Sequence, residues 1–445
     1  MQVLWGIGGM LVVLLLAFAM STNRRAISLR TVLGALAIQI VFAFVVLRWD
    51  MGRQALAAVA GGVQRVIDSS KEGIEFLVGP ILPSQGTVVA FQVLPIIIFV
   101  SSLTAVLYHW NILQWVVRII GGGLQKVLGT TRAESLNATA NIFLGQTESP
   151  LVIRPYLASM TRSEFFAVMV GGLATVAGTV MVGYSMLGAK LDNLIAASFM
   201  AAPAGLLMAK IVMPETERTD AAPAGEAETA ATSDRGEAVA IDPPDDASPA
   251  TAGEPSRQGT PAAVAAERSE DVEPKPRNVI DAAATGASDG LRLALNVGAM
   301  LFAFVSLIAL VNLLVGGIGG LFGMPDLTLQ QILGYAFSPL MWVIGVPWDE
   351  AVAAGGFVGE KLVINEFVAF ADFGPQIGQF SEKSATIITF ALTGFANLGS
   401  LAILLGGLGG LVPSRRGWIA RDGIRAILAG TLANLLSATI AGILV

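Results

Sequence analysis

Two short polar stretches carry the side chains that could bind a solute, and both interrupt apolar regions of the chain. The first reads GQTESP at 145–150, directly after an apolar run, and the second reads NEF at 365–367. A carboxylate inside hydrocarbon is costly unless it is paired or hydrated, so Glu148 and Glu366 are candidates for function. The structural alternative is an ion pair, to Arg154 for the first and to Lys361 for the second.

The polar side chains of these regions share one chemical character. They offer amides, hydroxyls and carboxylate acceptors, and no fixed cation stands out among them. The set suits a neutral ligand rich in hydroxyl, amide and ring-nitrogen groups, and it suits a phosphate or carboxylate poorly. Phe395 would stack on or wall a planar ring, or serve simply as core. The candidates are Gln146, Thr147, Glu148, Glu366, Asn397 and Ser400.

Two further polar residues precede or follow the first stretch and suggest a cation site. Asn141 lies five residues before Gln146, and Thr175 lies in a later helix interrupted by small residues. An amide oxygen, a hydroxyl and freed backbone carbonyls are hard, neutral ligands of the kind that hold Na⁺. Asn and Thr serve equally as hydrogen-bond partners between membrane helices, and that alternative stays open.

The composition places the chain in a membrane. Hydrophobic residues make up 54% and charged residues 13%, and the mean hydropathy is +0.69. The absence of cysteine excludes disulfides, thiolate catalysis and Cys-bound metals. The only histidine, His109, follows an apolar run and precedes Trp110, which is typical of an interfacial aromatic belt. An intramembrane enzyme would therefore find little here for an activated nucleophile or a metal site. The enzymatic alternative that stays open is a two-carboxylate protease at Glu148 and Glu366, which lack the surrounding features expected of one.

The hydropathy pattern predicts an all-α polytopic protein. Apolar runs of about 20 residues are long enough to cross the bilayer, and we interpret the run at 4–20 as a retained helix and not a signal peptide. Residues 49–83 and 110–130 are amphipathic and suit helices lying along the interface, as do residues 278–292. About eight crossings are expected, at 3–20, 30–47, 87–108, 164–188, 191–213, 293–320, 384–412 and 424–445.

Each polar stretch divides its region into two apolar arms, and each arm is too short to cross the membrane alone. The 29 residues between Arg132 and Arg162 divide at GQTESP, and those between Glu350 and Lys383 divide at the NEF stretch. Two half-length arms favour a re-entrant hairpin over two spans. Irregular backbone at that depth is tolerated only inside protein or a water-filled cavity, so each polar tip should face the interior.

The chain contains an internal repeat of hairpin, interrupted helix and helix. The interrupted helices read GLATVAGT at 172–179 and GFANLGSL at 394–401. Three crossings separate the hairpins, so the second hairpin enters from the opposite face and the repeats are inverted. Such repeats, with polar tips meeting near the midplane, are expected of a secondary transporter. In any single helix, the same small-residue pattern also marks ordinary close packing.

One segment differs from all the rest in composition. Residues 214–277 hold 15 acidic and 6 basic residues and no Phe, Trp or Tyr. Such a segment cannot bury enough apolar surface to fold, so we predict a disordered acidic loop.

Several motifs along the chain resemble the concentrative nucleoside transporter family. The chain is identified as a bacterial member, and the resemblance favours the Na⁺-coupled branch of the family. The motifs are GQTESPL at 145–151, NEFVA at 365–369, SAT at 384–386 with GFANLGS at 394–400, AASFMAAP at 196–203, MPETE at 213–217 and NVIDAA at 278–283. The resemblance covers nearly the whole chain outside 214–277.

The resemblance implies a nucleoside symporter of the bacterial inner membrane that works as a homotrimer by an elevator-like movement, with no nucleic-acid partner. It divides the chain into scaffold helices at 1–130 and 278–325 and transport-domain repeats at 131–213 and 326–445, separated by the loop 214–277. Proton-coupled members exist, so H⁺ is an alternative to Na⁺. A transporter of another neutral polar solute with the same fold is a second alternative.

The resemblance also implies roles for individual residues. Gln146, Thr147, Glu148 and Val180 would contact the nucleobase. Glu366, Asn397 and Ser400 would bind the ribose, and Phe395 would line the site. Na⁺ would be held by the side chains of Asn141 and Thr175 and by the carbonyls of Leu144 and Val176. The sequence departs from the family pattern at Ser149, where Ala is common, and in the length of the acidic loop.

Overall fold

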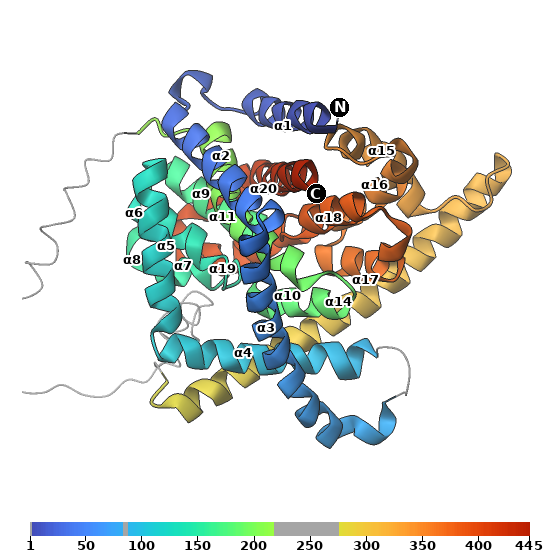
Figure 1. Ribbon diagram of the computed structural model, residues 1–445, viewed down its shortest axis with the longest axis horizontal. Coiled ribbons are helices and arrows are strands. Elements are labelled where there is room, and N and C mark those ends of the chain that lie inside the picture. The colour runs from blue at the N-terminus through green and yellow to red at the C-terminus, as the bar shows by residue number, and fades with distance from the viewer. Residues whose placement is uncertain (1, 83–87, 218–275) are drawn as a thin grey trace, which may run out of the picture. The chain divides into compact units, whose positions relative to one another are not determined.

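The computed structural model describes residues 2–82, 88–217 and 276–445, and these residues form helices and turns without a β-strand. Figure 1 shows the arrangement. Within the described ranges, six helical segments are long and apolar enough to cross a membrane, or seven if a pair of helices bent by 118° counts as one span. The prediction of an all-α polytopic protein is confirmed. The predicted acidic loop lies almost wholly outside the described residues.

The first third of the chain follows the predicted pattern of spans and amphipathic helices. Each amphipathic helix buries one stripe: α3 buries Ala60, Ile67 and Ile74, which share a helical face. The elements are α1 (Gln2–Ala19), α2 (Leu29–Ala43) with the π-helical turn η2 (Phe44–Arg48), α3 (Asp50–Val78), η4 (Val89–Val93), α4 (Leu94–His109) and α5 (Ile112–Leu128).

The first repeat begins with a short helix, a non-helical tip and two helical turns. These are α6 (Arg132–Ala140), α7 (Ser149–Val152) and α8 (Arg154–Leu157). Next come α9 (Arg162–Ala174) and α10 (Gly178–Met186), separated by a break at 175–177, and then α11 (Leu191–Val212). Capping boxes begin both α6 and α9, at Thr131–Glu134 and Thr161–Glu164.

The second repeat has the same order of elements. It comprises α16 (Trp348–Val363), a tip at 364–365 and α17 (Glu366–Gln376), then α18 (Glu382–Leu392) and α19 (Gly399–Leu411) around a break at 393–398, and finally α20 (Arg416–Leu444). Both interrupted helices are therefore broken where the sequence places small and polar residues together.

Two sequence predictions in the region between the repeats need correction. Residues 278–292 do not form a separate interfacial helix, because α14 runs unbroken over Val279–Leu321. Its polar residues Ser288 and Asp289 are exposed, so the change in polarity marks a change of surroundings along one helix. The second error is an omission: α15 (Leu329–Val343) precedes the second hairpin, as α5 precedes the first.

The helices differ strongly in how much of their surface is buried. About nine-tenths of the most apolar stretch of α11 is buried (94%), and the corresponding figure for α9–α10 and for α20 is 83%. In α4 and α14 the figures are 17% and 6%. The broken helices and their neighbours thus form the protein interior, and α4 with α14 presents apolar surface outward.

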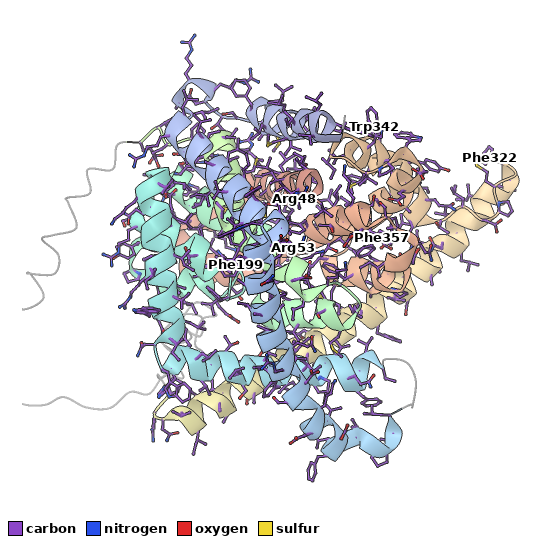
Figure 2. The ribbon with its side chains drawn as sticks, viewed as in Figure 1. Arg48, Arg53, Phe199, Phe322, Trp342 and Phe357 are labelled. Carbon is purple, nitrogen blue, oxygen red and sulfur yellow. The ribbon has the colours of Figure 1, made fainter. Side chains whose placement is uncertain are left out.

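Aromatic packing connects the first hairpin to the helices around it. Phe199 of α11, labelled in Figure 2, stacks on Phe42 of α2 at 5.8 Å between ring centroids. It also meets Phe143 of the first tip edge-on at 6.0 Å. One ring therefore holds the tip against both α2 and α11.

Candidate functional site

The first tip lies against the helix α9 that follows it. Gln146 and Asn141 are buried, whereas Thr147 and Glu148 are exposed. Gly172 permits this approach, because a Cβ there would lie 2.9 Å from the Cβ of Gln146. Within the described part of the chain, Gln146 Oε1 is buried and accepts no hydrogen bond. A buried acceptor of this kind favours a ligand with a donor group.

Backbone bonds connect this tip to the break between α9 and α10. The Gly178 N–H donates to the Phe143 carbonyl at 3.2 Å. Asn141 and Thr175 both contact Gly171: the Thr175 hydroxyl donates to its carbonyl at 2.8 Å, and a Cβ there would lie 3.4 Å from Asn141 Nδ2. The two predicted cation ligands are therefore brought together.

The oxygen atoms available here fit a small hard cation. Asn141 Oδ1 accepts a hydrogen bond from the Ser149 hydroxyl at 2.6 Å, so Ser149 belongs to the same polar cluster. Among the residues that the structure describes, no hydrogen bond to the carbonyl of Leu144 or Val176 is found. Neutral amide, hydroxyl and carbonyl oxygens of this kind are ligands that Na⁺ accepts.

The second tip presents a carboxylate that is fully engaged. Asn365 caps α17 by accepting from the Val368 N–H at 2.9 Å, which places Glu366 at the helix start. Glu366 Oε1 accepts from the Tyr184 hydroxyl at 3.0 Å, and Oε2 accepts from Asn397 Nδ2 at 3.0 Å. Both donors come from broken helices, one from each repeat.

The second break completes this arrangement. Asn397 Oδ1 accepts from the Ser400 N–H at 2.8 Å, and the Ser400 hydroxyl donates to the Phe395 carbonyl at 2.5 Å. Glu366, Asn397 and Ser400 therefore lie together, as their predicted shared role requires.

The two breaks also meet directly. The Phe395 N–H donates to the Thr175 carbonyl at 3.1 Å, which joins the second break to the first. Thr147 of the first tip approaches α19, since a Cβ at Gly407 would lie 2.8 Å from Thr147 Cγ2. Val180 is buried two residues into α10. These contacts connect the first tip and the first break to the second break and to α19, the helix that carries Ser400.

Neither of the alternative ion pairs is formed in the described part of the chain. Glu148 accepts a hydrogen bond from the Gly145 N–H at 3.3 Å and makes no ion pair with Arg154. The Lys361 ammonium donates to the Ala391 carbonyl and to Asn434 Oδ1, both at 2.7 Å, rather than to Glu366.

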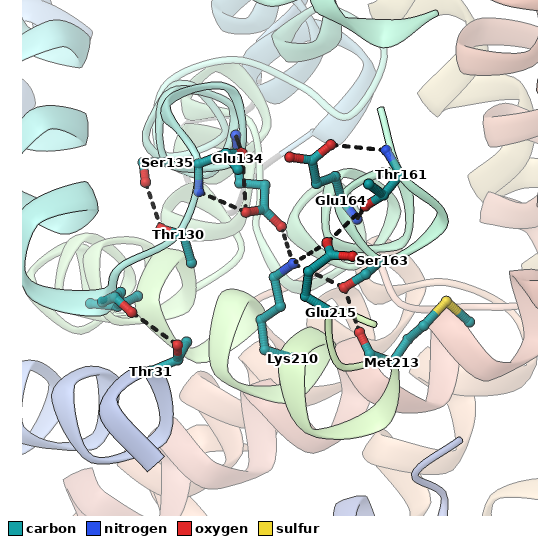
Figure 3. Close-up of polar contacts among 12 residues, drawn as sticks. Thr31, Thr130, Glu134, Ser135, Thr161, Ser163, Glu164, Lys210, Met213 and Glu215 are labelled. Atoms are coloured by element: carbon teal, nitrogen blue, oxygen red, sulfur yellow. Dashed lines mark hydrogen bonds and ion pairs between the residues drawn. The ribbon is translucent and has the colours of Figure 1, made fainter. Parts of the chain in front are cut away.

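A buried charge cluster anchors the base of the first hairpin, as Figure 3 shows. Lys210 of α11 pairs with Glu134 of α6 at 2.5 Å and donates to the Ser163 hydroxyl of α9 at 2.9 Å. Glu215 lies 3.7 Å from Lys210 and accepts from the Thr161 hydroxyl at 2.8 Å. These contacts hold α6, α9 and α11 together and so position the tip.

Three functional candidates were missed by the sequence reasoning: Tyr184, Asn434 and the bonding role of Lys361. Each is at most 2% exposed, and Tyr184 and Asn434 stand within largely apolar helices, whereas Lys361 follows the equally buried Glu360. That isolation is the signal that could have found Tyr184 and Asn434, because a lone polar residue in a membrane helix marks a partner or a function.

This arrangement of broken helices around a polar interior defines a helical membrane transporter. Family models described as the C-terminus and N-terminus of the Na⁺-dependent nucleoside transporters match residues 193–442 and 8–81, and a nucleoside-recognition model matches 90–190. The chain belongs to this family of concentrative nucleoside transporters, which transport nucleosides and are not enzymes.

Individual relatives agree with this assignment. The nucleoside permease NupC of Helicobacter pylori is 43% identical, over 99% of this chain and 98% of the relative. Sodium/nucleoside cotransporter 2 of the rat is 36% identical, over 98% of this chain and 62% of the relative. With its apolar helices and its relation to bacterial permeases, the chain is a multi-pass protein of the bacterial inner membrane.

The fold matches solved structures of the family closely. A structure of CNTnw in an inward-facing substrate-bound state is 47% identical, with a TM-score of 0.86, over 100% of this chain and 98% of the other. A variant of CNTnw in an outward-facing state gives the same TM-score, with 46% identity and the same coverage. The solved relatives thus include both alternating-access states.

Proposed function

We propose that this chain is a Na⁺:nucleoside symporter whose two tips contact one nucleoside. The carboxylate of Glu366, held between Tyr184 and Asn397, is the observation that carries the proposal. A buried carboxylate fixed by donors from both repeats is preorganised to accept hydrogen bonds from ribose hydroxyls. Asn397 and Ser400 would complete this ribose site, and Phe395 would wall it.

The nucleobase would bind at the first tip. Gln146 offers a buried acceptor that has no partner among the described residues. The exposed Thr147 and Glu148 side chains offer a hydroxyl and a carboxylate. Val180 would supply an apolar contact. These groups together match the mixed donors and acceptors on the edge of a base.

Na⁺ would bind behind the first tip, at the oxygens of Asn141 and Thr175 and the carbonyls of Leu144 and Val176. Its binding would hold the tip against the break at 175–177. A nucleoside would then meet an ordered site, and each ligand would bind more tightly in the presence of the other.

Transport would move the repeats 131–213 and 326–445 as an elevator against a scaffold of 1–130 and 278–325. The contrast between the buried α9, α11 and α20 and the outward-facing α4 and α14 supports this division. The exposed apolar residues of α14, such as Phe302 and Leu313, suit contacts with lipid and with the other subunits of a homotrimer. The close approach of α1 to α20, at Gly6 and Ile443, is the place to test the boundary by cross-linking.

The test is uptake of radiolabelled uridine and adenosine into proteoliposomes under an inward Na⁺ gradient, with K⁺ in its place as control. We expect accumulation above equilibrium only with Na⁺. Uptake that follows a pH gradient in K⁺ would move the coupling to protons, and no uptake of either nucleoside under any gradient would overturn the proposed function.

A further inference from the structure

A buried Asn–Lys pair fills the space between the two helix breaks. Asn434 of α20 and Lys361 of α16 are 2% and 1% exposed. The Lys361 ammonium donates to Asn434 Oδ1 at 2.7 Å and to the Ala391 carbonyl at 2.7 Å. Asn434 Nδ2 donates to the carbonyls of Ala174, at 2.6 Å, and of Thr393, at 2.8 Å.

These bonds satisfy the backbone groups that the breaks leave without partners. Ala174 is the last residue of α9, and Ala391 and Thr393 lie at the end of α18. The last carbonyls of a helix have no intrahelical donor, and a buried carbonyl without a partner destabilises the fold. Gly394 is required beside this pair, because a Cβ there would lie 2.8 Å from the Ala174 carbonyl oxygen and from Asn434 Cγ.

The same bonds connect the two proposed ligand sites. Ala174 directly precedes Thr175, a proposed Na⁺ ligand, and Thr393 lies two residues before Phe395, which would wall the nucleoside. The Phe395 N–H in turn donates to the Thr175 carbonyl. A single side chain, Asn434, therefore fixes both breaks at the points where each contributes to a site.

We propose that Asn434, held in place by Lys361, is the positioning residue through which Na⁺ and nucleoside affect each other's affinity. The inference rests on the proposed function, since it concerns the same two ligands. Na⁺ at Thr175 fixes the end of α9, Asn434 transmits that position to Thr393, and the Phe395–Ser400 segment is then ordered for the ribose. By linkage the effect is reciprocal, so nucleoside tightens Na⁺ binding by the same factor.

The experiment is calorimetric binding of uridine to the purified full chain in Na⁺ and in choline, which gives the ratio of the two dissociation constants. For the wild type we expect a ratio in the range of about 5 to 150. Asn434→Asp keeps an acceptor for Lys361 and loses both N–H donors, and we expect its ratio to fall below about 2. Thr439→Val is the matched control, because Thr439 is buried on the same helix and bonds only within it.

A second variant tests the pair from the opposite side. Gly394→Ala adds one methyl group against Ala174 and Asn434, and it should also lower the ratio, which decides the matter if Asn434→Asp does not fold. A wild-type ratio in either folded variant, or equal weakening of uridine binding with and without Na⁺, would overturn the proposal. Failure of the wild type to bind uridine would instead overturn the proposed function.

Discussion

The two hairpin tips occupy equivalent places in the repeat but differ in how far they are ordered in advance. At the second tip, Glu366 is 5% exposed and bonded to donors from both repeats. At the first tip, Glu148 is exposed, and among the described residues its carboxylate accepts a hydrogen bond only from the Gly145 N–H, at 3.3 Å. Under the proposed function, this difference predicts a ribose site that is preorganised and a base site that becomes ordered when its ligands bind.

Of the four substitutions, Glu366→Gln should weaken uridine binding most. It tests whether the second tip is the preorganised part of the site. The amide loses one acceptor and the charge that Tyr184 and Asn397 both face. A hydrogen bond to a charged group contributes about 1.5–3 kcal/mol, so we expect uridine binding to weaken by about 10- to 100-fold. The matched control is Glu382→Gln, in an exposed ion pair with Lys190, which should bind as the wild type does. Unchanged uridine affinity in Glu366→Gln would remove Glu366 from the site.

Tyr184→Phe tests whether the order of the second tip depends on its donors. The ring would keep its stack on Phe370, at 4.4 Å between centroids, while Glu366 would lose one of its two bonds. We expect the uptake KM for uridine to rise about 10-fold and the ligand-free Tm to fall, because a buried carboxylate oxygen of Glu366 loses its donor. Tyr156→Phe, at an exposed tyrosine, is the control. An unaltered KM in Tyr184→Phe would mean that the second tip is not preorganised by this bond.

Glu148→Gln should weaken uridine binding without changing the ligand-free Tm, which would separate the first tip from the second. Because Glu148 has few partners without ligand, its Tm should match the wild type, while uridine affinity falls about 5-fold, by about 1 kcal/mol. Thermal denaturation with and without uridine measures both. Glu75→Gln on the exposed face of α3 is the control. A large drop in the ligand-free Tm would show that the first tip is as preordered as the second.

Ser149→Ala should give the smallest effect, and the quantity that it changes should be the affinity for Na⁺. The variant removes a neutral bond to Asn141 Oδ1 worth about 0.5–1 kcal/mol, so the half-saturating Na⁺ concentration for uptake should rise about 2- to 5-fold. Ser159→Ala, at an exposed serine that bonds the backbone, is the control. A lower Na⁺ requirement in Ser149→Ala would show that Ser149 competes with the cation for Asn141.

Local patterns in the sequence predicted the parts of the fold that have local causes. Both tips and both breaks fall where polar or small residues interrupt apolar runs, at 141–148, 175–177, 364–365 and 393–398. Such interruptions change the backbone within a few residues, so each leaves a visible mark in the sequence. The family motifs then related these positions to one kind of ligand.

The parts of the fold and of the candidate site that the sequence did not predict depend on contacts between residues far apart in the chain. Asn434 bonds Ala174 across 260 positions, and Tyr184 reaches Glu366 across 182, so no local pattern reveals either pair. The continuity of α14 was missed because its surroundings change from polar to apolar along one helix. The close packing of Gly286 and Gly290 on Ser101 of α4 shows why that helix needs small residues there.

The central claim, that one nucleoside contacts both tips with its ribose at Glu366, is tested most directly by binding of uridine and 2′,3′-dideoxyuridine. The two ligands would be compared calorimetrically on the wild type, Glu366→Gln and Glu148→Gln in Na⁺. We predict that the wild type and Glu148→Gln prefer uridine strongly, while Glu366→Gln no longer distinguishes the two. Full discrimination in Glu366→Gln, or its loss in Glu148→Gln alone, would contradict the account.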